Sequence, residues 1–132
     1  WSSDVCSSDL PWTGRTIRQS DNYHLDHLLP LSIYPINEMW NLVPSDPRVN
    51  VHEKRDRIPS AAALDKARPL LVQTYDRYRE FDPLKTALHD DVELRFASLD
   101  PGSDSFTVDV AEAATSLIDR IATYRNIERF EP

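Results

Sequence analysis

The pattern of hydrophobic and polar positions changes near residue 45 and divides the chain into two parts. Residues 23–29 alternate loosely between apolar and polar side chains, and residues 39–44 form a second apolar run that ends at a proline. Both patterns predict short β-strands. Residues 30–38 contain two prolines and an asparagine and predict a loop.

A helix is predicted directly after the second strand. Ser45 or Asp46 can cap it, and Pro47 would lie in its first turn, where proline is favoured. We expect this helix to run to about Arg57 and to be stopped by Pro59. The first part of the chain therefore predicts strand, loop, strand and helix, in that order.

The remainder of the chain has helical periodicity in residues 60–81, 83–99 and 108–124, with a turn at 101–104. Pro69 lies inside the first of these segments and predicts a kink or a break. His89 stands beside two aspartates, and we expect it at the surface. The apolar stripes are Leu64, Leu71, Tyr75 and Tyr78; Leu84, Leu88, Val92 and Phe96 or Leu99; and Val110, Ala114, Leu117, Ile118, Ile121 and Tyr124.

The first ten residues, WSSDVCSSDL, differ from everything that follows. They repeat Ser-Ser-Asp, have no apolar period, and lack the basic and apolar runs of a signal peptide. The string resembles one reading frame of a common DNA-sequencing adapter, so we expect an artefactual segment and a natural protein that continues upstream. Setting it aside removes Cys6, the only cysteine, and with it any disulfide or zinc framework.

Charge is distributed unevenly over the chain, whose formal net charge is −7. Residues 11–60 are neutral, whereas residues 61–132 carry nine basic and fourteen acidic side chains. This balance argues against broad adhesion to nucleic acid but allows a small local site. No stretch approaches the roughly 18 apolar residues of a membrane span, and we expect a cytoplasmic protein. Four basic residues that form either phosphate contacts or a solvated helix face are Arg48, Lys54, Arg55 and Arg57.

The first predicted strand, within YHLDHLLPL, holds polar side chains in an apolar setting. A hard cation such as Mg²⁺ is typically held by one or two protein oxygens, which Asp26 and Asn50 can supply. A neutral histidine beside such a site can take a proton from a water aimed at phosphorus. The metal would stabilise the leaving oxygen. One acid, one amide and one histidine are therefore sufficient for metal-assisted phosphodiester hydrolysis.

The segment YHLDHLLPLS…MWNLVPSDPRVNVHEKRDRIPS resembles the His-Asn-His (HNH) endonuclease motif. It is most similar to the branch that includes the HNH domain of RNA-guided CRISPR nucleases and related bacterial proteins. That branch has an Asp-His pair followed by two residues and a proline, an Asn-Leu-Val-Pro strand, a helix asparagine nine positions later, and a Lys-x-Asp-x-x-Pro ending. The matching residues here are Asp26, His27 and Pro30; Asn41–Pro44; Asn50; and Lys54–Pro59.

The resemblance implies an α+β fold, with a ββα-metal nuclease core over residues 11–60 and a helical extension over residues 61–132. It implies a divalent metal, Mg²⁺ or else Mn²⁺, a nucleic-acid partner that we expect to be DNA, and no membrane partner. A non-cutting scaffold with the same shape is the alternative. A structural zinc module is a more distant one, because the remaining ligands are scattered histidines.

Carried over residue by residue, the resemblance implies that His27 is the general base and that Asp26 is a metal ligand. Asn50 would be the second ligand, with His52 as its alternative because histidine occupies that helix position in parts of the family. Asn41 would complete the catalytic set by pinning the loop between the strands. His24 is expected to be a bystander.

Overall fold

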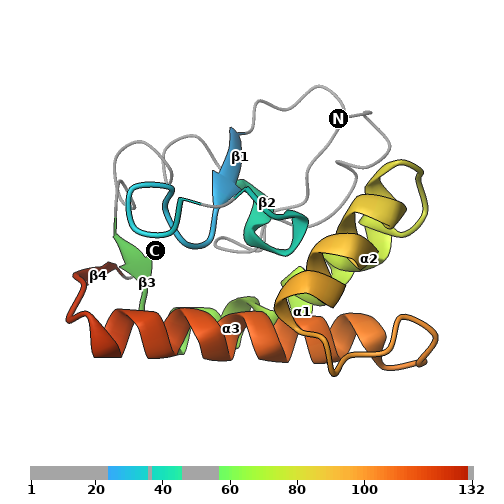
Figure 1. Cartoon of the computed structure of the whole chain (residues 1–132). Coiled ribbons are helices and arrows are strands. Elements are labelled where there is room, and N and C mark those ends of the chain that lie inside the picture. Colours follow the sequence, from blue (N-terminus) through green and yellow to red (C-terminus); the bar gives the residue numbers. More distant parts are fainter. Residues whose placement is uncertain (1–23, 36, 46–56, 131–132) are drawn as a thin grey trace.

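The computed structural model describes residues 24–35, 37–45 and 57–130. Within these ranges, small strands are followed by three helices, which confirms the predicted α+β class with a helical C-terminal part. Figure 1 shows α1 and α3 side by side, with β1 and β2 on one side of this pair. The elements are β1 (His24–His27), the 3-10 helix η1 (Met39–Asn41), β2 (Leu42–Ser45), β3 (Ile58–Pro59), α1 (Ala61–Tyr78), α2 (Leu84–Arg95), α3 (Phe106–Tyr124) and β4 (Arg129–Phe130).

Strands β1 and β2 form an antiparallel pair in which Asp26 lies opposite Val43 and His27 opposite Leu42. The second strand begins later than predicted, because residues 39–41 form a 3-10 turn rather than extended chain. The backbone N–H of Asn41 donates to the carbonyl of Glu38 at 2.9 Å, and this bond closes the turn. The helix expected after Ser45 falls on residues 46–56, outside the described residues.

A second pair of strands was not predicted from the sequence. Strand β3 pairs with β4 in parallel, and the N–H of Ile58 donates to the carbonyl of Glu128 at 3.1 Å. The N–H of Ser60 donates to the carbonyl of Phe130 at 2.9 Å. Two residues per strand leave no apolar alternation for a sequence pattern to reveal. The pair ties the start of α1 to the end of the described chain.

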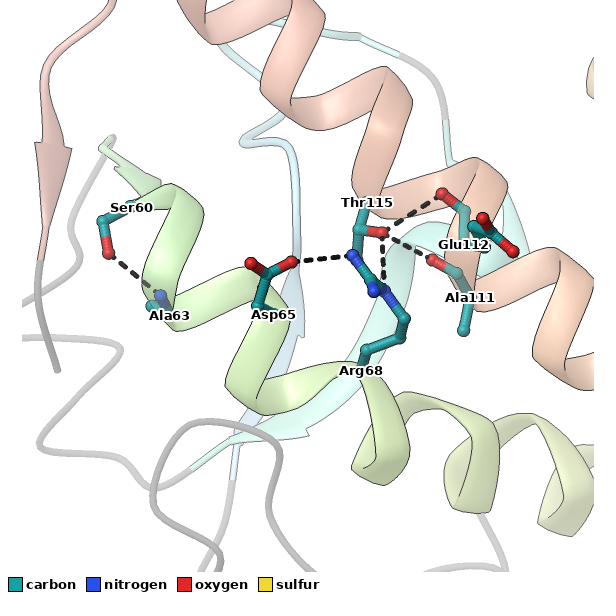
Figure 2. A network of polar contacts seen from close by, with 7 residues as sticks. All are labelled: Ser60, Ala63, Asp65, Arg68, Ala111, Glu112 and Thr115. Atoms are coloured by element: carbon teal, nitrogen blue, oxygen red, sulfur yellow. Dashed lines mark hydrogen bonds and ion pairs between the residues drawn. The ribbon is translucent and has the colours of Figure 1, made fainter.

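Helix α1 begins at a side-chain cap and continues through Pro69. The hydroxyl of Ser60 accepts a hydrogen bond from the N–H of Ala63 at 3.1 Å (Figure 2), which satisfies one of the N–H groups left unpaired at a helix start. Leu64 and Leu71, before and after the proline, are both buried against the same core. Tertiary packing therefore holds the helix together where one backbone hydrogen bond is missing.

Polar contacts also join α1 to α3 (Figure 2). The guanidinium of Arg68 donates to Asp65 at 2.8 Å and to the Thr115 hydroxyl at 3.4 Å. That hydroxyl in turn donates to the carbonyl of Ala111 at 2.9 Å. The two long helices are thus linked at mid-length by a chain of hydrogen bonds beside their apolar contact.

The core receives side chains from η1, β2, β3, β4 and the three α-helices, and from Leu28 and Leu29 directly after β1. The α1 stripe is confirmed, since all four of its members are buried. On α3, however, Tyr124 is 95% exposed. The buried face of the last turns contains Ile118 and Ala122, and a residue two positions after Ala122 points to the opposite side of the helix. The larger core side chains include Leu28, Leu29, Trp40, Val43, Ile58, Leu64, Leu71, Tyr75, Tyr78, Leu88, Val92, Phe106, Val110, Ile118 and Phe130.

The prediction of a surface histidine at position 89 is wrong. The ring of His89 is half-buried and meets the edge of Phe106 at 5.2 Å between ring centroids. His89 follows the buried Leu88 by one position, and the start of α3 covers this part of α2. Within the described ranges, no helix is both long enough and apolar enough to cross a membrane.

Candidate functional site

The Asp-His pair lies where β1 ends. Asp26 is buried at 6% exposure, and the next residue, His27, is half-buried. His27 Nε2 lies 3.0 Å from the amide oxygen of Asn37, a residue of the connection between β1 and η1. Which of the two groups donates depends on the tautomer of the imidazole. The contact orients the ring at the end of β1.

Asn37 is a site residue that sequence reasoning missed. It lies ten positions after His27 in a proline-containing loop, and no spacing or periodicity distinguishes it from an ordinary loop asparagine. Only the folded path of the connection brings its side chain to the imidazole.

Asn41 is fully buried and continues the strand pairing with its side chain. The N–H of Leu28 donates to the backbone carbonyl of Asn41 at 2.8 Å. Beyond that point, the Asn41 amide oxygen accepts from the N–H of Leu29 at 2.8 Å, and its NH₂ donates to the Leu29 carbonyl at 3.0 Å. A side-chain amide is needed because it alone offers a donor and an acceptor in the geometry of a peptide group. It fixes the backbone two residues after His27.

A buried carboxylate begins the same 3-10 turn. Glu38 is 4% exposed and accepts from the Trp40 indole N–H at 2.6 Å. Arg95, at the end of α2, donates to the two oxygens of this carboxylate at 3.2 and 2.8 Å. The hydrogen bond to Glu38 is the main reason that the pKa of Arg95 is raised. A charged pair therefore joins α2 to the turn that contains Asn41.

Three further side chains from the helices hold the backbone of the same turn. Asp91 accepts from the N–H of Met39 at 2.9 Å. Burial raises the pKa of Asp91, although this hydrogen bond acts in the opposite direction. The Tyr75 hydroxyl donates to the carbonyl of Trp40 at 2.5 Å, and the Tyr78 hydroxyl donates to the carbonyl of Leu42.

Helices α1 and α2 hold residues 38–42 through Tyr75, Tyr78, Asp91 and Arg95. We name these four side chains the helix clamp. None of these four hydrogen bonds goes to Asp26 or His27. They hold the turn that contains Asn41, and Asn41 in turn is bonded to Leu29, two residues after His27.

Of the predicted basic residues, only Arg57 is described. Its guanidinium lies 5.9 Å from the centre of the Phe130 ring and 3.9 Å from the Glu128 carboxylate. Within the described residues, no group of three or more His, Cys, Asp or Glu is placed to hold a metal. The other predicted site residues lie outside the described ranges: Arg48, Asn50, His52, Lys54 and Arg55.

The described site thus contains Asp26 and His27 at the end of β1. The buried side chain of Asn41, in the 3-10 turn before β2, is bonded to the backbone just after them. Residues 10–60 match the model of the HNH endonuclease family. The match ends one residue before α1, so it covers both strands of the hairpin and none of the three described helices. A comparison with curated proteins gives no match. A comparison with solved structures gives none either.

Proposed function

We propose that the chain is a metal-dependent endonuclease that hydrolyses phosphodiester bonds in DNA. The family match over residues 10–60 supports nuclease activity. The observation that carries the proposal is the position of His27, oriented by Asn37 at the end of β1, one residue after Asp26. Imidazole is the side chain best suited to exchange a proton near neutral pH, and the ring must be oriented toward its substrate to do so.

In this proposal His27 is the general base that takes a proton from the attacking water. The contact with Asn37 holds the ring while it takes the proton. Asn41 holds the backbone after His27 through Leu29, so the base is kept at the strand end while it changes charge. A base held in one geometry avoids the entropic cost of searching for its substrate.

A divalent metal would be held by Asp26 and by Asn50, with His52 as the alternative to Asn50. The donor chemistry fits Mg²⁺ or Mn²⁺: Asp26, the residue before the base, supplies a carboxylate oxygen, and an amide supplies a second oxygen. The described residues contain no cluster of His and Cys of the kind that zinc prefers. When bound, the metal would stabilise negative charge on the leaving oxygen.

We further propose that the segment is related to the branch that includes the HNH domain of RNA-guided CRISPR nucleases. The support is the motif spacing: Asp26-His27 with Pro30, then Asn41 and Asn50 nine positions apart. The basic residues Arg48, Lys54, Arg55 and Arg57 would contact DNA phosphates in an otherwise acidic chain.

Nicking of supercoiled plasmid tests the proposal. The purified chain should convert supercoiled DNA to open circles with Mg²⁺ or Mn²⁺, and excess EDTA should abolish the conversion. Asp26→Ala should lose activity, whereas Asp65→Ala, which removes an exposed carboxylate on α1, should retain it. No cutting with either metal, and Mn²⁺ binding that is the same in both variants, would instead support a non-cutting nucleic-acid-binding scaffold.

A further inference from the structure

A shallow groove with a volume of about 340 Å³ runs along the last turns of α3. It is lined by Leu117, Arg120, Ile121, Tyr124 and Arg125. Tyr124 is 95% exposed. An exposed aromatic ring between two arginines is a combination that binds single-stranded nucleic acid, because bases stack on the ring and phosphates pair with the cations.

The charge of the groove is opposite to that of the surrounding chain. Residues 61–132 carry an excess of five acidic side chains, yet no acidic residue lines the groove. Arg120 is exposed and makes no hydrogen bond or ion pair with any residue that the structure describes. The nearby carboxylate of Asp119 is paired with Arg129 at 2.8 Å. Arg120 is therefore available to an anionic ligand, whereas Arg125 uses one guanidinium nitrogen in a hydrogen bond to the carbonyl of Ile33.

The groove is also connected to the candidate active site. One guanidinium nitrogen of Arg125 donates to the carbonyl of Ile33 at 2.8 Å. Ile33 belongs to the connection between β1 and η1, which also contains Asn37, the hydrogen-bond partner of His27. Figure 1 shows this connection on the same side of the molecule as the C-terminal half of α3, with β3 and β4 at that end. Arg57, the last of the predicted DNA-contacting residues, precedes β3.

We propose that this groove binds an unpaired nucleotide of the DNA substrate on the strand that reaches the Asp26–His27 site. Tyr124 stacks on the base, and Arg120 and Arg125 contact the flanking phosphates. This inference rests on the proposed function for the position of the DNA. It adds that the helical extension binds substrate and that the preferred substrate contains single-stranded DNA.

Fluorescence anisotropy in EDTA measures this binding without cleavage. The probe is a fluorescein-labelled single-stranded 20-nucleotide DNA, and the same sequence as a duplex is the comparison. Tyr124→Ser should weaken binding of the single strand about tenfold and that of the duplex much less. Arg120→Gln with Arg125→Gln should reduce the slope of log K against log salt by about 1.4, or about 0.7 for each lost phosphate contact.

The matched control is Arg77→Gln with Lys85→Gln. This variant also removes two positive charges, one from the last turn of α1 and one from α2. It should change the single-strand affinity and the salt slope much less than the groove variants do. Circular dichroism of each variant checks that it is folded. Equal affinities for the Tyr124 variant and the unmodified chain would overturn the inference. So would a dimer in sedimentation that Tyr124→Ser dissociates, because the groove would then bind a second copy of the chain.

Failure of this inference can be distinguished from failure of the nuclease proposal. The anisotropy measurement is made in EDTA, where no DNA is cut, so its result does not depend on cleavage. If the chain cuts DNA but the groove variants bind and cut normally, only the groove assignment is wrong. If the groove variants lose single-strand affinity while the chain never cuts, the groove is supported and the nuclease proposal fails.

Discussion

Replacement of Arg95 by methionine removes the guanidinium that holds Glu38 and keeps most of the side chain's apolar length. The Glu38 carboxylate, at 4% exposure, would then retain only the Trp40 indole as a partner among the contacts described above. The variant would also lose the contact between Arg95 and the Tyr34 ring, which lies 5.3 Å from the guanidinium carbon. The turn that contains Asn41 would be left with an uncompensated buried charge.

The expected cost is about 2 kcal/mol of unfolding free energy. Removal of one partner from a fully buried ion pair costs about 3–5 kcal/mol. Here the Arg95 side chain is 31% exposed, so water reaches the pair and lowers that figure. Domains of this size have about 5–15 kcal/mol of stability, and the variant should therefore remain folded at 25 °C.

Urea denaturation followed by far-UV circular dichroism measures the loss. The matched control is Arg77→Met, which breaks the 3.1 Å ion pair between Arg77 in the last turn of α1 and Glu80 after the helix. Its cost should be under about 1 kcal/mol. The double variant Glu38→Gln with Arg95→Met should be less destabilised than Arg95→Met alone, because the introduced amide still accepts from Trp40 and no charge remains buried.

The same variant tests whether the helix clamp supports the candidate site. At 25 °C, folded Arg95→Met should nick plasmid more slowly than Arg77→Met, because the loosened turn holds Asn41 and lies beside Asn37. If Arg95→Met and Arg77→Met have the same stability and the same nicking rate, the clamp has no role in either.

Three further outcomes are expected. Asn37→Ala should lower the nicking rate about tenfold with little change in stability, since Asn37 is exposed but orients His27; an unchanged rate would remove its positioning role. Asn41→Asp should lower the free energy of unfolding by about 2 kcal/mol at pH 7, because the buried carboxylate has no N–H to donate to the Leu29 carbonyl. The deficit should shrink near pH 4.5, where protonation restores a donor, and a deficit independent of pH would contradict this account. Burial, then Arg79 and Lys85, lower the pKa of His89, so the unfolded chain binds the proton more readily. The unmodified protein should therefore lose more stability between pH 7.5 and 5.5 than His89→Gln in urea titrations; equal losses would exclude this linkage.

Periodicity predicted the helices well because long apolar stripes have many members. Leu64, Leu71, Tyr75 and Tyr78 all reached the core as expected. The burial of single positions near helix ends was harder to predict. Tyr124 fitted the spacing of its stripe but is exposed. The neighbouring elements determine which face of the last turn is buried, and the type of residue at one position does not.

The candidate site could be predicted only in part. The Asp26-His27 pair and Asn41 stand out in sequence because they lie in a recognisable motif. Asn37 does not, and neither does the helix clamp, because a hydrogen bond between residues 52 or 57 positions apart leaves no local pattern. Such contacts depend on how two separate elements pack, which a single sequence does not show.

The central claim is that His27 is the base of a phosphodiester hydrolase. The most direct measurement is the initial nicking rate of supercoiled DNA at saturating Mg²⁺ for His27→Ala and His24→Ala, two variants that each remove one imidazole from the same strand. We expect His27→Ala to be at least a hundredfold slower than the unmodified chain, as general-base removal typically gives about 10²–10⁴-fold, and His24→Ala to be nearly unchanged. Similar rates for the two variants, with both folded, would contradict the account.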